Sequence, residues 1–198
     1  MEGGSSVEFK KIKSLSYDKP QVLHAMLSKL ADNIGLYANF QIECGAQVIQ
    51  VFDSWAGNLS PLDYDTFAAP YQVPHRPSDS CRRANLTGWL LQAKVIAQIK
   101  ASHPEVPVII YINKSGALLE RMARSGADII SLDWTVTVEE ARARIGHQIG
   151  IQGNLDPMVL FAPDQVIKDR TEEILKAAGG RLGRPAMLDN TLYVGRAI

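Results

Sequence analysis

Short apolar segments alternate with helical patterns along most of this chain, and the alternation restricts its possible folds more than any other feature. Four segments are rich in β-branched residues, at 46–52, 106–112, 127–134 and 147–153. Such runs are typical of strands buried on both faces. Strands that alternate with helices predict βα units and a parallel sheet. The expected fold class is therefore α/β.

Helices are indicated by apolar spacing and by residues suited to helix ends. The longest is predicted over 18–44, with Asp18 as its cap and Pro20 in its first turn. Its apolar positions recur at helical spacing: Val22, Leu23, Met26, Leu27, Leu30, Ile34 and Tyr37. A capping box of Thr137 and Glu140 opens a later helix that ends before Gly146. Further helices are predicted around 117–122 and from Pro163 to Gly179.

Composition excludes several classes of function. The 198 residues suffice for one domain with a core. The net charge is zero, so the charge of the chain does not indicate binding to nucleic acid or to a membrane surface. A local basic pocket for an anionic substrate remains compatible with this balance. Cys44 and Cys81 read as two reduced thiols, not as a disulfide framework or a metal site. No apolar run approaches the roughly 20 residues of a membrane span, and the start, MEGGSSVEFKK, is typical of neither a signal nor a transit peptide.

Polar residues follow each of the four predicted strands. They are Asp53 and Ser54, then Asn113, Lys114 and Ser115, then Asp133 and Trp134, and finally Asn154 and Asp156. In parallel α/β folds the site lies at the carboxyl ends of the strands. One such group could be a helix cap, but four together favour a site. Four strands cannot close a barrel of eight, so the chain is either a smaller open sheet or part of something larger.

Several longer motifs resemble the uroporphyrinogen decarboxylase family, and most closely its plant and cyanobacterial branch. They are EGGSS (2–6), FDSWAGNLSP (52–61), FAAPY (67–71), LLERMARSGADIISLDWTV (118–136) and IQGNLDP (151–157). The resemblance implies a partial (β/α)8 TIM barrel of about four βα units, corresponding to the C-terminal half, truncated or alternatively spliced. The family is usually a homodimer and works without a cofactor or metal. It removes carbon dioxide from the four acetate side chains of uroporphyrinogen III and yields coproporphyrinogen III, in haem and chlorophyll biosynthesis.

The resemblance assigns one site residue to this chain. Ser54 falls on the family's substrate-binding serine, whose hydroxyl would hydrogen-bond a substrate carboxylate; the alternative is that Ser54 caps a turn or helix. The family's catalytic Arg, Asp and Tyr positions fall upstream of Met1, and its late His motif, NLGHG, is missing from the tail. No catalytic residue is therefore assigned.

Other residues that could suggest chemistry are expected to have structural roles. The four histidines, His24, His75, His103 and His147, match no catalytic position and are expected at the surface or in packing. The indoles of Trp55 and Trp134 are expected to pack. Asp133 is expected to order its loop, by capping the helix that follows. Asp156, beside Pro157, is expected to shape a turn at the mouth of the barrel.

Two segments depart from the family pattern. Residues 72–92 form an atypical insert whose composition suits a solvated loop, and 181–198 form a tail without family motifs, so the domain is expected to span 1–180. Both segments look like translated non-coding sequence. A truncated or alternatively spliced form, or an imperfect gene model, would account for them.

Four functions follow as alternatives. The first is a porphyrinogen decarboxylase by descent, inactive as an isolated chain, acting on uroporphyrinogen III. The second is a barrel methyltransferase with corrinoid or thiol chemistry, disfavoured because Cys44 and Cys81 lie in no ligand-like cluster. The third is a non-catalytic half-barrel that associates with full-length subunits through open strand edges. The fourth is a chain that does not fold stably. The resemblance implies the chloroplast, and the lack of a visible transit peptide leaves the cytoplasm as the alternative.

Overall fold

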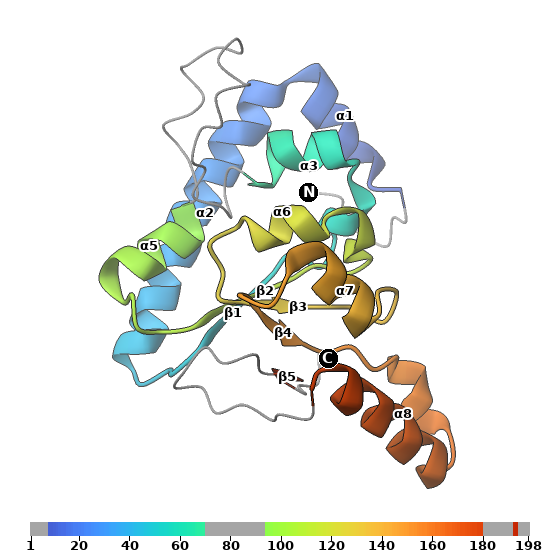
Figure 1. The fold of residues 1–198 in the computed structure, drawn as a ribbon. Coiled ribbons are helices and arrows are strands. Elements are labelled where there is room, and N and C mark those ends of the chain that lie inside the picture. Colours follow the sequence, from blue (N-terminus) through green and yellow to red (C-terminus); the bar gives the residue numbers. More distant parts are fainter. Residues whose placement is uncertain (1–7, 70–93, 180–191, 194–198) are drawn as a thin grey trace.

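Five parallel strands form the centre of the computed structural model, which describes residues 8–69, 94–179 and 192–193 (Figure 1). The strands are β1 (Ile49–Phe52), β2 (Val108–Tyr111), β3 (Ile129–Ser131), β4 (Gly150–Gln152) and β5 (Leu192–Tyr193). The four predicted strands are confirmed, although each is shorter than the apolar segment that contains it. β5 lies in the tail and was not predicted. The insert at 72–92 lies outside the described residues.

Helices surround the sheet and fill most of the intervals between the strands. They are α1 (Lys10–Asp18), α2 (Pro20–Glu43), α3 (Pro61–Phe67), α5 (Lys94–Ser102), α6 (Leu119–Ala123), α7 (Val138–Ile145) and α8 (Asp164–Ala177), with short 3-10 helices η1 (Ala56–Asn58), η4 (Ser115–Ala117) and η5 (Pro157–Phe161). Within the described ranges, every helix falls short of the length or the apolarity that crossing a bilayer requires.

The order of the strands identifies the sheet as an arc of a barrel wall. Each strand pairs in parallel with the next strand of the chain, from β1 to β5, and the order never reverses within the described sheet. A doubly wound sheet would contain such a reversal, and helices would cover both of its faces. Figure 1 shows α3, α6 and α7 along one side of the sheet, with α2 beside β1 and α8 beyond β4. The predicted partial barrel of about four βα units is confirmed.

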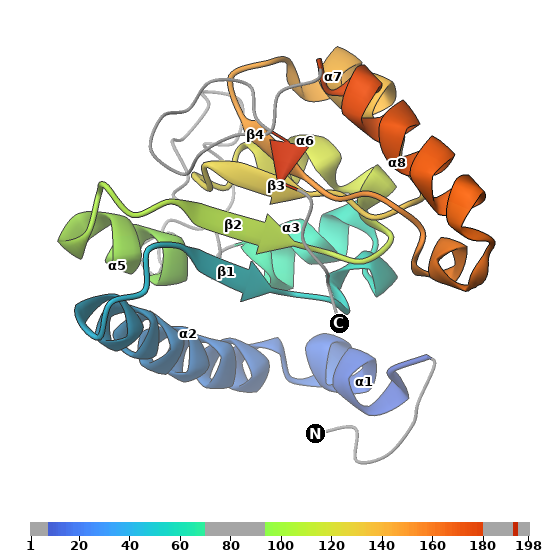
Figure 2. The same ribbon diagram turned by 90° about the horizontal axis from the view of Figure 1, so that it is seen from below.

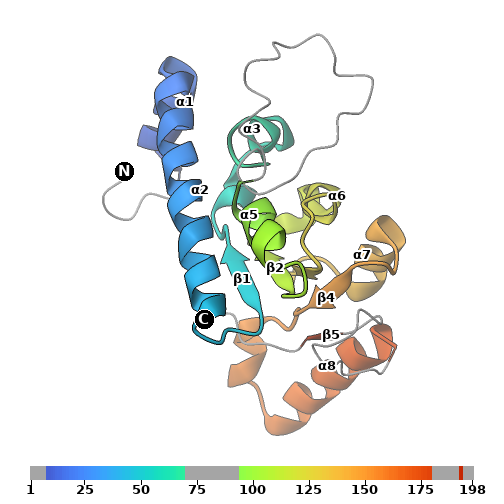
Figure 3. The ribbon, with the colours of Figure 1, turned by 90° about the vertical axis from the view of Figure 1, so that its left-hand side faces the viewer.

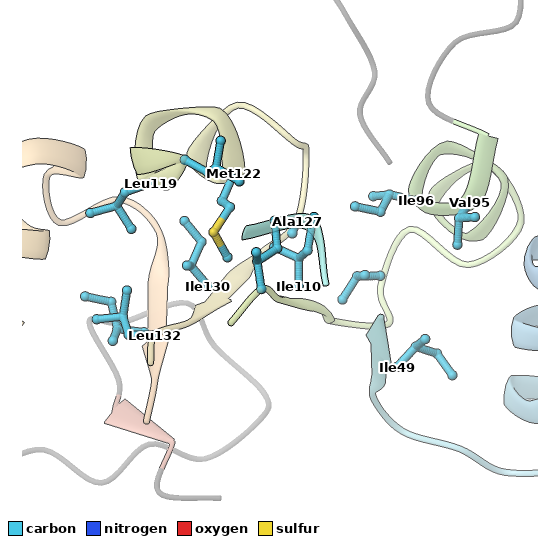
Figure 4. Close-up of a cluster of buried hydrophobic side chains, with 14 of the residues drawn as sticks. Ile49, Val95, Ile96, Ile110, Leu119, Met122, Ala127, Ile130 and Leu132 are labelled. Atoms are coloured by element: carbon cyan, nitrogen blue, oxygen red, sulfur yellow. The ribbon is translucent and has the colours of Figure 1, made fainter. Parts of the chain in front are cut away.

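One face of the sheet carries the hydrophobic core. Residues of alternate positions in the strands, such as Ile49, Ile110 and Ile130, join side chains from the helices in this cluster. Figure 4 shows Leu119 and Met122 of α6 over Ile130. The fully buried side chains at this face are large and branched or flexible, which suits close packing between a sheet and helices.

The other face of the sheet is the inner face of the arc. The register places Gln50 and Phe52 of β1 beside Ile109 and Tyr111 of β2 on this side. Burial on both faces was predicted for all strands, and it is confirmed for β2 and β3 but wrong for β1, where the Phe52 side chain is 57% exposed. Phe52 is exposed because β1 lies at the edge of the arc and faces its open interior.

The predicted helix over 18–44 is two helices. Pro20 is the first residue of α2, while Asp18 is the last residue of α1, and the irregular backbone of Lys19 separates them. Asp18 therefore does not cap α2, and that prediction is wrong. The predicted first-turn proline is confirmed, and it fits because the first helical position has no N–H partner to lose.

α2 carries two apolar faces and buries one of them. Its buried positions include Ala31 and Ala38, and it packs closely along α5. At Gly35 an added Cβ would lie only 1.7 Å from Oε1 of Gln98, so a larger residue there would require the Gln98 side chain of α5 to move. The second face, called the α2 stripe below, consists of Val22, Leu30, Ile34, Tyr37 and Phe40, with side chains 47–61% exposed. Helical spacing in the sequence identified most of these positions and did not say which of them are buried.

Caps and ion pairs fix the outer helices. The Thr137 hydroxyl accepts a hydrogen bond from the Glu140 N–H at 3.1 Å, as the capping box predicts. The Glu140 carboxylate instead pairs with Arg144 one turn later. Arg144 also binds both carboxylate oxygens of Glu120 at 2.7 and 2.8 Å, and its Nη2 donates to the Gly116 carbonyl. This guanidinium therefore joins α7 to α6 and η4.

This pair predicts a dependence of stability on acid pH. The hydrogen bonds from Arg144 lower the pKa of Glu120 to about 2. A carboxyl group whose folded pKa is depressed adds stability above its unfolded pKa, and this stability is lost as the pH falls towards 2. Glu120→Gln should therefore reduce the loss of unfolding free energy between pH 5 and pH 2.5 by about 1 kcal/mol or less, because solvent screens this partly exposed pair. Urea unfolding at both pH values measures it.

The control for this experiment is Glu173→Gln, which removes an exposed pair with Arg170. It should leave the pH dependence unchanged. Equal acid-side losses in wild type and Glu120→Gln would contradict the role given to Arg144.

Candidate functional site

The polar residues that follow β1 to β4 lie at one edge of the sheet because the strands are parallel. Figure 2 shows the arrowheads of β1, β2 and β3 pointing to the same side. We call this edge the rim, which comprises residues 53–57, 113–116, 132–136 and 153–156. The prediction that these four segments share one edge is confirmed.

Ser54 lies in the turn between β1 and η1 and is partly buried. The turn is held by its backbone, since the Asp53 N–H donates to the Tyr111 carbonyl and the Ala56 N–H to the Asp53 carbonyl. No side chain caps η1, and among the described residues the Ser54 hydroxyl makes no hydrogen bond. The alternative in which Ser54 serves as a cap is therefore not supported.

Asp133 is the main organiser of the rim. Its side chain is 2% exposed and accepts hydrogen bonds from the N–H groups of Lys114 and Ser115, at the start of η4. It also accepts from the N–H and the hydroxyl of Thr135, at 2.9 and 2.5 Å. The prediction that Asp133 orders its own loop is confirmed. The prediction that it caps the following helix is wrong, because Thr137 caps α7 and Asp133 binds the loop after β2.

Close backbone contacts complete the connection between the loops. A Cβ at Gly57 would lie 1.9 Å from the Asn113 carbonyl oxygen, and one at Gly153 would lie 2.5 Å from the Leu132 carbonyl oxygen. Gly153 also has a φ of +106°, which side chains disfavour. The β1 loop thus rests on the β2 loop, and the β4 loop rests on the end of β3. With Asp133 between them, the four loops form one continuous rim.

Below the rim, uncharged polar groups cross the inner face of the arc. Gln152 of β4 lies 3.3 Å from both the Gln50 side-chain oxygen and the Ser131 hydroxyl. Phe52 and Tyr111 meet edge to face above this row, with ring centroids 5.9 Å apart. Burial, and then the charge of Asp133, raise the pKa of Tyr111, so its phenol stays protonated. Sequence analysis missed this row, although the glutamines interrupting two apolar strands were a signal of it.

Several buried polar atoms near the rim have no partner among the described residues. They are Nε2 of Gln50, Oδ1 of Asn113, Oγ of Ser115 and Oδ1 of Asn154. Unpaired buried polar atoms are costly and are uncommon in folded proteins. Their concentration here indicates a surface that a ligand or a further part of the protein completes.

Several other charged and histidine side chains lie apart from this arrangement. Arg121 binds both oxygens of Asp65 in α3 at 2.7 and 2.8 Å, so it joins two helices and is not free for a ligand. His24 stacks on Phe67, and His103 lies 3.8 Å from Glu105, which agrees with packing and surface roles. His75 lies outside the described residues. Asp156 accepts from the Met158 N–H, which fits the predicted turn.

The two tryptophans of the rim are more exposed than predicted. Trp134 is partly exposed, and Trp55 is mostly exposed, with its ring centroid 5.5 Å from that of Phe9. Trp55 and Asp53 also line a mainly apolar cavity of about 370 Å³ between α1, α2 and the β1 loop. The prediction that both rings are packed is wrong, because the side of the rim that they face is open. Among the described residues, no group of three potential metal ligands occurs.

Comparisons with known proteins point to one family. A family model described as uroporphyrinogen decarboxylase matches residues 1–76 and 90–184. The uroporphyrinogen decarboxylase of Crocosphaera subtropica is 45% identical over 195 residues, which are 98% of this chain and 49% of that protein. The uroporphyrinogen decarboxylase of a Synechococcus species is 49% identical over 181 residues, 91% of this chain and 44% of that protein.

A solved structure supports the fold independently. A methyltransferase from Methanosarcina mazei superposes with a TM-score of 0.67 at 20% identity, over 96% of this chain and 48% of that one. At this identity the likeness concerns the fold alone. In all these comparisons the chain spans about half the length of the proteins that it matches.

Proposed function

The chain belongs to the uroporphyrinogen decarboxylase family, and from this we propose that it supplies one half of a barrel that decarboxylates the acetate side chains of uroporphyrinogen III. Coproporphyrinogen III is the product of the complete reaction. The observation that carries the proposal is the rim, where the Ser54 hydroxyl, which makes no hydrogen bond among the described residues, lies in a turn fixed by backbone hydrogen bonds, above an uncharged inner face.

The chemistry makes specific demands on such a site. Loss of carbon dioxide leaves an electron pair on the former acetate carbon, and a pyrrole protonated at the adjacent ring carbon accepts it. Ser54 donates a hydrogen bond to a substrate carboxylate and so orients the side chain. Phe52 and Tyr111 offer aromatic surface to the macrocycle, which is largely apolar apart from its N–H groups and carboxylates.

Most of the remaining catalytic groups would come from the other half of the barrel. The resemblance places the Arg segment, the pyrrole-binding Asp and the Tyr upstream of residue 1, and the late His in a segment replaced here. This chain therefore contributes binding and orientation. Incubated alone and anaerobically with uroporphyrinogen III, the 198-residue chain should release no carboxyl group, as followed by chromatography of the products.

A chimera tests the function without relying on association. Residues 1–179 replace the matching segment of the Crocosphaera subtropica relative in a single polypeptide. The chimera should yield products with seven to four carboxylates. Ser54→Ala should lower its kcat/KM by about 10- to 100-fold, because a hydrogen bond to a charged group contributes roughly 1.5–3 kcal/mol.

The matched control is Ser14→Ala, at an exposed position of α1. It should leave kcat/KM unchanged. A folded chimera without turnover would overturn the proposed function, and turnover insensitive to Ser54→Ala would overturn the role of Ser54.

The compartment and the oligomeric state are proposed from the family. We place the protein in the plastid, since its relatives are cyanobacterial, and we propose that the completed barrel forms a homodimer. A fluorescent fusion confined to the cytosol would contradict the first. A chimera that sediments as a monomer would contradict the second.

The second candidate function is a half-barrel that binds other subunits without catalysing a reaction. The specific observation in its favour is that β1 ends the described sheet as an open edge. Inhibition of a full-length relative by added chain, without turnover by the chimera, would favour this function over the first.

A further inference from the structure

We propose that the Lys114 side chain binds a substrate carboxylate at the rim, beside the loop that carries Ser54, and that this carboxylate is one that the reaction leaves in place. The substrate class rests on the proposed function, since uroporphyrinogen III carries eight carboxylates and its final product carries four. The ionic contact does not require turnover, so a binding measurement tests it separately.

Lys114 is held in a backbone conformation that side chains disfavour. Its φ of 58° and ψ of 43° lie in the left-handed region, and among the described residues other than glycine only Phe9 shares a positive φ. The Lys114 N–H donates to the buried Asp133 carboxylate, which fixes this conformation. Glycine would adopt the same conformation at a lower cost. Strain of this kind persists where the surrounding structure imposes it, and it is concentrated at functional sites.

The backbone of Lys114 lies against the loop that carries Ser54. A Cβ at Gly57 would lie 3.1 Å from the Lys114 carbonyl oxygen, so the loops after β1 and β2 meet at this point. Figure 3 shows α3 and α6, the helices that follow these two loops, side by side, and Arg121 of α6 binds Asp65 of α3. Lys114 and Ser54 therefore belong to neighbouring loops of one connected structure.

Lys114 supplies the positive charge of the rim. The four rim segments contain one basic residue, Lys114, and three acidic residues, Asp53, Asp133 and Asp156. The Lys114 side chain is exposed, and its ammonium group forms no ion pair or hydrogen bond with any residue that the structure describes. By contrast, the guanidinium group of Arg121 is already bound. An exposed ammonium group at the mouth of a site suits an anionic ligand.

The chemistry indicates which carboxylate Lys114 binds. In the reacting acetate, neutral carbon dioxide departs and the electron pair passes to the ring. An ammonium group paired with that carboxylate would stabilise the ground state more than the transition state, and so would slow the reaction. On a carboxylate that stays in place, the same group binds both states equally, which lowers KM and leaves kcat unchanged. Ser54, a neutral donor, thus suits the reacting acetate, and Lys114 suits a neighbouring carboxylate.

Equilibrium binding tests the contact directly. The folded chimera described above is titrated into uroporphyrin III, the fluorescent oxidised form that carries the same eight carboxylates. Lys114→Met removes the charge but keeps a side chain of similar length, and it should raise Kd about three- to tenfold. Lys114→Arg should bind as wild type. The difference between wild type and Lys114→Met should shrink between about 0.05 M and about 0.5 M salt.

The matched control is Lys29→Met, which makes the same change of charge at an exposed lysine of α2, outside the rim. It should leave Kd unchanged. Turnover by the chimera adds a second readout, in which Lys114→Met should raise KM by the same factor and change kcat by less than about twofold. A lower kcat at unchanged KM would contradict the assignment to a carboxylate that stays in place.

Lys114→Gly separates the ligand contact from a structural role. Glycine relieves the left-handed strain and keeps the N–H that Asp133 accepts, so the midpoint of urea unfolding of the full 198-residue chain should rise. Kd should nevertheless increase as in Lys114→Met. A Kd that is insensitive to Lys114→Met, or no binding by the folded wild-type chimera, would overturn the proposal. Binding that depends on Lys114 without turnover rejects only the proposed function.

Discussion

Asp133→Ala is expected to lower the free energy of unfolding by about 3–5 kcal/mol, the largest effect of any single change at the rim. The side chain is buried and accepts the N–H groups of Lys114, Ser115 and Thr135 as well as the Thr135 hydroxyl. Alanine leaves three backbone donors without an acceptor in a site too closed for water to replace the carboxylate fully. Equilibrium urea unfolding at pH 7 measures the loss.

The control is Asp133→Asn, which keeps one acceptor oxygen in the same position. It should cost distinctly less than alanine, because the oxygen can still accept from one of the two loops. A loss below about 1 kcal/mol for Asp133→Ala would show that the loops after β2 and β3 do not depend on this carboxylate.

Gly57→Ala should have the second largest effect, a loss of about 2–4 kcal/mol. The added methyl group would lie 1.9 Å from the Asn113 carbonyl oxygen, and because this is a backbone atom it cannot move without displacing the loop after β2. Thermal and urea unfolding both report this loss.

Gly116→Ala provides the matched control, since its Cβ would lie 3.4 Å from Cγ2 of Val136, an ordinary contact. It should change stability by no more than about 0.5 kcal/mol. Equal stabilities for the two alanine variants would mean that the β1 and β2 loops are not in close contact in solution.

Periodicity and end signals predicted most of the fold. β2 and β3 were recognised as apolar runs because both of their faces are buried. Thr137 was recognised as a helix cap because its hydroxyl accepts a hydrogen bond from a backbone N–H three residues later. These features are local or depend on average burial. Strand limits were less accurate, since Gly150–Gln152 is only the part of its apolar segment that finds a partner strand.

The errors arose where burial depends on distant parts of the chain. The helical spacing of the stripe residues Ile34 and Tyr37 did not say whether they are covered, and a helix at the end of an arc has a neighbour on one side only. α1 was missed because its nine residues contain few apolar positions. Local sequence carries no information about which of two apolar faces will be covered.

For the site, the sequence predicted a location better than it predicted contacts. The clustering of polar residues after four strands indicated the rim, and the motif match indicated Ser54. The link from Asp133 to Lys114 and Ser115 joins two βα units, and the row of Gln50, Ser131 and Gln152 spans three strands. Such contacts follow from the register between strands, which a single sequence does not specify.

The sequential order of the strands also bears on the kinetics of folding. Ile109 pairs with Ile129, and Ile129 with Gly150, so β2, β3 and β4 join through short loops, whereas Ile49 reaches Val108 across a connection roughly three times as long. Closing the longer loop costs only about 1 kcal/mol more, since each doubling of length adds about 0.6 kcal/mol. It does, however, postpone that contact. We expect β2–β4 to form the early nucleus and β1 to dock late, so the strand that leads into the Ser54 turn would be among the first to open in native-state hydrogen exchange.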